Sequence, residues 1–260
     1  MRPIIIFSFI VFFSSIPLFA QISGSTSAKN IMTNSNRASK AKLTARMTID
    51  GYHQSGNIER TNASGTVLVS AIDSIKEFSF NSKYIYGEYN KTVNHKEYLA
   101  GIQYDHHPFS TISPFVRFEF YKNEFRKINA RYANLIGFKY RYFFKPEKID
   151  YSISTAFLYD VERYERDVEL PNKERFRVSV RPKFKHHFSE NIYLIAELYY
   201  KPNLLSFDDY IVCGNLNFNV RIFKRSLLRL SYEHEYNNKP ATNMVKKTDA
   251  LLLAGLGIEF

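Results

Sequence analysis

The chain has 260 residues, a formal net charge of +11 and a mean hydropathy of −0.32. After its N-terminus, no segment approaches the ~18 continuous apolar residues that a spanning helix requires. The mature chain is therefore either soluble or a β-barrel. In a barrel, apolar and polar residues alternate along each strand, so a low mean hydropathy does not exclude an apolar outer face. Its 19 Tyr and 23 Phe favour the barrel, because aromatic rings gather at membrane interfaces. Cys213 is the single cysteine, which excludes an internal disulfide.

Residues Met1–Ala20 have the features of a signal peptide: Arg2, then the apolar run Ile4–Phe13, then the small Ala20. A spanning helix is disfavoured because the apolar run is short and Pro17 interrupts its end. We expect cleavage after about Ala20 and export to the bacterial outer membrane. Export makes nucleic acid an unsuitable partner for the positive charge, which can instead face a lumen or lipid phosphates.

Residues 21–42 are rich in Ser, Thr, Asn and Lys, and predict a flexible periplasmic tail. From residue 43 onward the chain alternates with a period of two, which is typical of an amphipathic strand. In the first strand apolar Ala45, Met47 and Ile49 alternate with Arg46, Thr48 and Asp50. The pattern recurs to Phe260 and predicts one all-β domain over 43–260, a closed antiparallel up-and-down transmembrane barrel of about twelve strands.

The connections between strands are expected to alternate in length, with short periplasmic turns and longer outer loops. Outer loops are predicted at residues 54–59, 87–95, 121–129, 162–174, 202–208 and 237–247. Aromatic side chains are expected in two girdles, one near each interface. The predicted outer girdle contains Tyr86, Tyr132, Tyr159, Tyr200, Tyr210 and Tyr232, and the inner one Phe78, Tyr104, Tyr142, Tyr151, Phe184 and Phe260. A secreted soluble β-sandwich or lipocalin-like barrel, with the apolar face inside, is the alternative that keeps the strands.

Several turn and wall residues resemble a known family. They are Ser55-Gly56-Asn57, Tyr86-Gly87-Glu88, Tyr104-Asp105, Ser113-Pro114-Phe115, Glu124-Phe125-Arg126, Arg131 and Gly137. This order is similar to the family called domain of unknown function 481, whose members include proteins labelled salt-induced outer-membrane proteins. The family commonly has Thr where this chain has Ile58. The resemblance covers about 43–260 and implies an outer-membrane barrel with no established chemistry.

Candidate catalytic and metal-ligating residues are few. The pairs His106-His107 and His186-His187 suggest a metal, but turns four strands apart in a barrel roughly 24 Å wide lie ~20 Å from each other. Ser231 and His234 have an odd spacing, so they face opposite sides of one strand and cannot form a dyad. No Gly-x-Ser-x-Gly element is present. We expect no cofactor, no metal and no enzymatic activity.

The inward-facing charges are the candidate functional residues, and basic side chains outnumber acidic ones among them. They are Arg46, Arg117, Glu119, Arg131, Lys139, Arg141, Arg175, Arg177, Arg181, Glu197, Arg221, Arg229 and Glu233. A lumen lined by Arg and Lys favours anions, which suggests a narrow anion-leaning channel for small solutes. Alternatively, these charges pair with one another and plug a small barrel, which would then be a structural or surface-interaction protein without transport. An outer-membrane hydrolase is a third and weaker hypothesis.

The expected partners follow from location. The last predicted strand, Asp249–Phe260, resembles the C-terminal signal recognised by the barrel assembly machinery, with Phe260 as its terminal aromatic residue. Outer-membrane lipid and lipopolysaccharide are the other expected partners. The charged loop 162–174 suits a surface partner or bridging divalent ions, although solvated loops commonly have such a composition.

Overall fold

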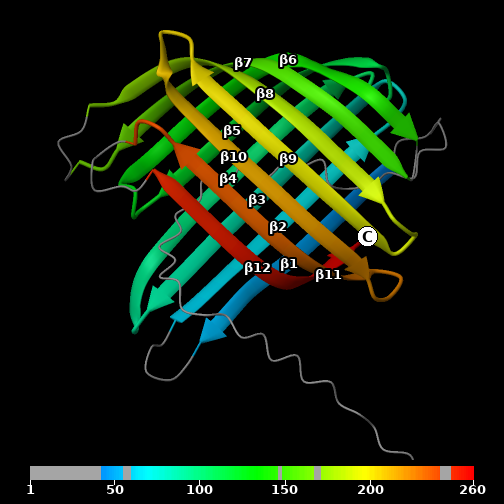
Figure 1. Cartoon of the computed structure of the whole chain (residues 1–260), viewed down its shortest axis with the longest axis horizontal. Helices are drawn as coiled ribbons and strands as arrows, with labels where there is room; N and C mark the ends of the chain where they lie inside the picture. Colours follow the sequence, from blue (N-terminus) through cyan, green and yellow to red (C-terminus); the bar gives the residue numbers. More distant parts are fainter. Residues whose placement is uncertain (1–41, 55–59, 146–147, 167–170, 241–246) are drawn as a thin grey trace, which may run out of the picture.

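In the computed structural model the described residues form one closed barrel of antiparallel strands and contain no helix (Figure 1). The structure describes residues 42–54, 60–145, 148–166, 171–240 and 247–260. The predicted signal peptide, almost all of the predicted tail and the Ser55-Gly56-Asn57 turn lie outside this part. The strands are β1 (Lys42–Gln54), β2 (Arg60–Ile72), β3 (Lys76–Tyr89), β4 (Thr92–His106), β5 (Ile112–Asn123), β6 (Ile128–Lys145), β7 (Ile149–Tyr164), β8 (Lys173–His187), β9 (Ile192–Asn203), β10 (Ser206–Arg221), β11 (Ser226–Asn237) and β12 (Thr248–Glu259).

Each strand pairs with its neighbours in the sequence, and β1 pairs with β12 to close the sheet. At this seam Arg46 is opposite Glu259, and the Phe260 amide donates a 2.8 Å hydrogen bond to the Ala45 carbonyl. Closure leaves no edge strand with unpaired backbone groups, which is what a membrane requires of a sheet. The predicted fold class is confirmed.

The barrel has its apolar residues outside and its polar residues inside. Ile49 is 74% exposed and Phe157 66% exposed, whereas Asp50 and Glu233 are 1% and 2% exposed. A soluble sandwich or lipocalin-like barrel has the reverse distribution, so that alternative is wrong. The exposed belt of Ile, Leu, Phe and Tyr side chains is stable where lipid, not water, surrounds the wall. Within the described ranges, no helix is long and apolar enough to cross a membrane.

A charged substitution on the lipid-facing belt should lower the free energy of unfolding, and by more at mid-membrane than near an interface. Ile136 lies midway along β6 and is 63% exposed, so Ile136→Arg is expected to lower the free energy of unfolding by about 2–4 kcal/mol. Ile112, 58% exposed at the first residue of β5, is the matched control, for which about 0–1 kcal/mol is expected. Urea unfolding in lipid vesicles measures both. Equal, small losses would mean that this face contacts water.

Several outer connections are shorter than predicted, because the strands continue pairing beyond the expected membrane boundary. The β3–β4 turn consists of Asn90 and Lys91, both at positive φ (47° and 62°), in place of a loop over 87–95. The β9–β10 turn is residues 204–205 in place of 202–208. These two outer connections are therefore shorter than every connection at the opposite end. At the β2–β3 turn, the Asp73 carboxylate accepts hydrogen bonds from the Ile75 and Lys76 amides, which lower the pKa of that carboxyl.

Many residues of the two predicted aromatic girdles contact neighbouring rings on the outer surface. In the inner set, Phe78 and Tyr104 have ring centroids 4.9 Å apart, and Tyr151 and Phe184 are 4.4 Å apart. In the outer set, Tyr200 and Tyr210 are 6.0 Å apart, while Tyr159 stacks on Phe176 at 4.8 Å. Such pairs across adjacent strands stabilise the sheet as well as suiting an interface.

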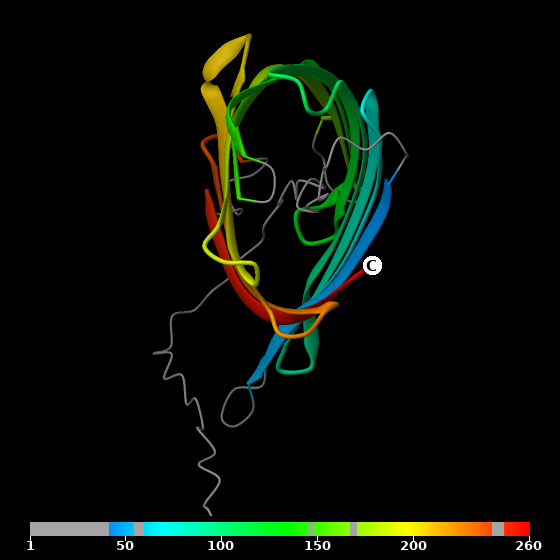
Figure 2. The ribbon, with the colours of Figure 1, turned by 90° about the vertical axis from the view of Figure 1, so that its right-hand side faces the viewer.

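The barrel is oval in cross-section, with β6 and β7 near one end of the long axis and β12 and β1 near the other (Figure 2). Strands β2–β4 therefore face β8–β11 across the short axis. We call the end with the β1 N-terminus and Phe260 the terminal rim, and the opposite end the distal rim. This flattening brings side chains from facing walls within reach of one another.

Candidate functional site

The interior is a dense network of ion pairs that includes most of the sequence-predicted charges. Ten of these thirteen residues are buried, and Arg131, Arg141 and Arg221 are half-buried. Several pair with acidic or basic residues of their own or nearby strands: Arg117 with Glu119 (2.6 Å), Lys139 with Asp105 (3.7 Å), Arg141 with Asp150 (3.3 Å), Glu197 with Lys183 (3.6 Å), Arg221 with Glu259 (2.6 Å) and Arg229 with Asp50 (3.5 Å). Pairing of this kind compensates the desolvation of buried charge.

Direct contacts cross the lumen between β1–β3 and β9–β12. Lys83 on β3 donates to both carboxylate oxygens of Glu233 on β11, at 2.6 and 2.7 Å. Nearer the terminal rim, Arg46 pairs with Glu259 and donates a 2.8 Å hydrogen bond to the Tyr193 hydroxyl on β9. Nearer the distal rim, Ile85 on β3 packs against Leu251 and Leu253 on β12. This half of the oval is tied together at three depths.

Arg126 also joins facing walls of the barrel. It lies in the turn between β5 and β6, yet it pairs with Glu235 on β11 (2.8 Å) and with Asp249 on β12. The Asn123 side chain fixes this turn by accepting hydrogen bonds from the Phe125 and Arg126 amides. The turn therefore reaches across the distal rim and holds the far wall.

A second cluster of ion pairs lies between β7, β8 and β10, near the distal rim. Arg177 is 1% exposed, pairs with Asp160 (3.2 Å) and Asp209 (2.8 Å), and donates to two backbone carbonyls. Arg175 pairs with Asp160, Glu162 and Asp209. Arg177 is thus enclosed by acceptors and does not face an open path.

Four cations on β6, β8 and β9 each lie over a tyrosine ring inside the barrel. We call Arg131, Lys201, Arg181 and Lys185 the cation row. Their distances to the ring centroids are 4.7 Å for Arg131 over Tyr121, 5.2 Å for Lys201 and 5.6 Å for Arg181 over Tyr199, and 5.7 Å for Lys185 over Tyr193. In the described part of the chain, Arg131, Lys185 and Lys201 have no carboxylate within ion-pair distance. Arg131 is near the distal end of β6 and Lys185 near the terminal end of β8, so the row runs along the lumen.

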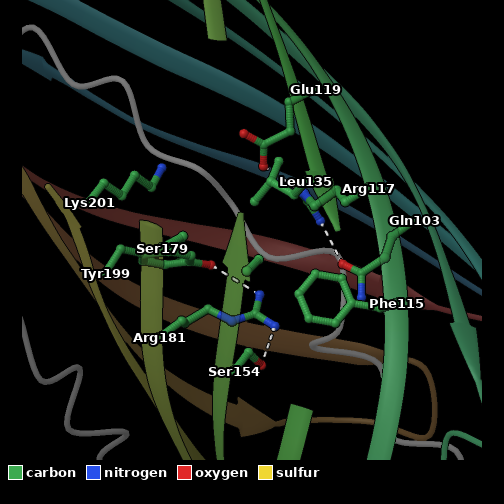
Figure 3. Close-up of a pocket in the computed structure, with 11 residues that line it drawn as sticks. Gln103, Phe115, Arg117, Glu119, Leu135, Ser154, Ser179, Arg181, Tyr199 and Lys201 are labelled. Carbon is green, nitrogen blue, oxygen red and sulfur yellow. Dashed lines mark hydrogen bonds and ion pairs between the residues drawn. The ribbon is translucent and has the colours of Figure 1, made fainter. Parts of the chain in front are cut away.

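A cavity of about 20 Å³ lies between these strands at mid-depth (Figure 3). Its charged lining consists of Arg117, Arg181, Lys201 and Glu119, and Arg117 already neutralises Glu119. Hydroxyl groups on Ser154, Ser179 and Tyr199 complete the polar side, and Phe115 and Leu135 form an apolar side. The surroundings of the cavity are therefore electropositive and rich in hydrogen-bond donors.

The described residues contain no cluster that could hold a metal ion, and Ser231 and His234 do not form a dyad. No three His, Cys, Asp or Glu side chains there could share a metal ion. Ser231 is buried and donates to Asn217 (2.8 Å), whereas His234 lies on the opposite face of β11. On the outer surface, His106 forms a 3.0 Å hydrogen bond with the Tyr104 hydroxyl, and His186 forms a 3.1 Å hydrogen bond with the Tyr151 hydroxyl.

Sequence reasoning missed several interior charges. Lys83 and Lys201 have the same inward parity as the predicted set, so the alternation could have found both. Arg126 could not be found in this way, because it lies in a turn where period-two alternation does not apply. Phe260 is 61% exposed at the terminal rim, with the Arg225 guanidinium 5.6 Å from its ring centroid.

Solved barrels with a similar overall architecture are known. The NanC porin is 10% identical with a TM-score of 0.46, and the match covers 84% of this chain and 99% of that one. The translocator domain of the autotransporter NalP from Neisseria meningitidis is 10% identical (TM-score 0.42, 86% and 89% covered), and an anion-selective porin from Comamonas acidovorans is 9% identical (TM-score 0.39, 85% and 99% covered). At these values the similarity assigns no solute or activity to this chain.

No curated protein matches the chain. A family model described as "Protein of unknown function, DUF481" matches residues 22–260, which is nearly the whole chain after the predicted signal peptide. The resemblance seen in the turn and wall residues is thereby confirmed. The chain belongs to the DUF481 family.

Proposed function

We propose that the protein is a bacterial outer-membrane barrel that lets small anions diffuse through the half of the lumen formed by β4–β9. The exposed apolar belt supports a membrane location, and the signal peptide predicted from the sequence supports export. Insertion would use the assembly machinery that recognises the terminal strand ending at Phe260. Lipid and lipopolysaccharide would surround the wall. No enzymatic role is proposed.

The single observation that carries the proposal is the cation row. Nearly all other buried charges in the described lumen are paired, so their fields largely cancel at a distance. Arg131, Lys201 and Lys185 have no carboxylate within ion-pair distance there, and they occupy successive depths of one wall. Positive groups along a narrow path lower the electrostatic barrier for anions and raise it for cations.

Conductance in planar bilayers tests the proposal. We expect the purified barrel to conduct, with a reversal potential in a KCl gradient that indicates anion preference. The double variant Lys185→Gln and Arg131→Gln should lower the ratio of anion to cation permeability. Lys122→Gln removes the same charge from the outward side of β5 and should leave the ratio unchanged.

An electrically silent barrel that is correctly folded would contradict the channel. It would favour the structural role instead, for which the contacts across the β1–β3 half of the lumen are the supporting observation. A conducting barrel with cation preference would also contradict the proposal.

A further inference from the structure

The mid-depth cavity contains a buried ammonium group without an anionic partner. Lys201 is 8% exposed, and in the described part of the chain its Nζ atom has neither a hydrogen bond nor an ion pair. The ammonium lies over the Tyr199 ring and lines the cavity (Figure 3). A buried charge without a partner is costly, so an additional ligand that supplies negative charge would stabilise this arrangement.

The neighbouring carboxylate does not balance the cations around the cavity. Glu119 is the single carboxylate among the described lining residues, and it accepts a 2.6 Å hydrogen bond from Arg117. Arg181 adds a second cation, which donates to the Tyr199 hydroxyl at 3.4 Å and to Ser154 at 3.3 Å. Its guanidinium lines the cavity together with these hydroxyl groups.

The size of the cavity restricts the guest. A volume of about 20 Å³ accommodates a body close to the size of a water molecule, whereas an engineered cavity that binds benzene measures about 150 Å³. Carboxylic acids with an organic body, sugar acids and phosphate esters would extend out of this volume into the lumen. A halide ion combines small size with negative charge, and needs no defined acceptor directions.

We propose that the cavity is a binding site for a single halide ion, chloride in the cell, held by Lys201 and Arg181. The apolar Phe115 and Leu135 exclude water from the opposite side, which strengthens the attraction between the ion and the two cations. This inference deepens the proposed channel function, because it names the class of anion and the point in the lumen where it pauses.

Chloride-35 NMR of the folded barrel in detergent micelles tests the site without requiring conduction. We expect saturable broadening of the chloride signal, reversed by bromide. Lys201→Met keeps the length of the side chain and should weaken chloride binding at least tenfold, whereas Lys201→Arg should retain it. Lys122→Gln should behave as the unchanged protein.

Bromide added to crystals should also give an anomalous peak inside the cavity. Absence of saturable broadening would overturn the site, and so would broadening that is unaltered in Lys201→Met. The two proposals can fail separately. Saturable broadening by a barrel that does not conduct would support the halide site and contradict the channel. Anion-selective conductance without saturable broadening would support the channel and contradict the halide site.

Discussion

A Lys83→Met variant is expected to lose about 3–5 kcal/mol of the free energy of unfolding, because the change leaves Glu233 buried without its cation. The two side chains are 2% and 3% exposed, and the pair joins facing walls of the barrel through two short hydrogen bonds. Urea unfolding in detergent micelles, followed by circular dichroism, measures the loss.

The double variant Lys83→Met with Glu233→Gln is the control for this prediction. It removes the unpaired charge as well as the pair, so much of the lost stability should return. A loss below about 1 kcal/mol in the single variant would mean that water reaches Glu233, as it reaches exposed ion pairs. That result would contradict a closed β1–β3 half of the lumen.

Arg126→Gln is expected to have a comparable cost, about 3–5 kcal/mol, because two buried carboxylates lose one shared cation. Arg126 pairs with Glu235 and Asp249 from the opposite side of the barrel. Freed from them, the β5–β6 turn no longer bridges the distal rim, so single-channel conductance should rise. Unfolding in micelles and bilayer recording give the two measurements.

The adjacent residue provides a matched control. Lys127 lies in the same turn and pairs with Glu165 at 3.1 Å, but its side chain is 46% exposed. Lys127→Gln should therefore change the free energy of unfolding by about 0–1 kcal/mol and leave the conductance unaltered. If Arg126→Gln raised no conductance while the barrel stayed folded, the turn would not obstruct the path.

The strands and their orientation were predictable because a β-strand turns successive side chains to opposite faces. Met47 and Ile49 could be assigned to the lipid side, and Arg46 and Asp50 to the interior, from alternation alone. The boundaries were less predictable. Alternation weakens where strands leave the membrane, which is why the two-residue turn at Asn90 and Lys91 was expected to be a long loop.

The candidate site was predictable only in part. The basic excess at inward positions pointed to an anion-leaning lumen, yet Arg177 and Arg175 are occupied by Asp160 and Asp209. Lys201, which was not in the predicted set, is the buried cation that lines the cavity. Alternation along a strand predicts which side of the wall a residue faces. It does not predict which residues of the facing wall lie opposite it.

The sequence by itself determined that this protein is a chain of amphipathic strands, and which residues of each strand face inward, because both follow from local patterns. Only the tertiary structure decided which charges neutralise one another. Lys83 and Glu233 are 150 positions apart, and Arg126 and Asp249 are 123 apart. Such partners meet because the sheet closes, tilts and flattens into an oval, and these properties belong to the whole barrel and not to any one strand.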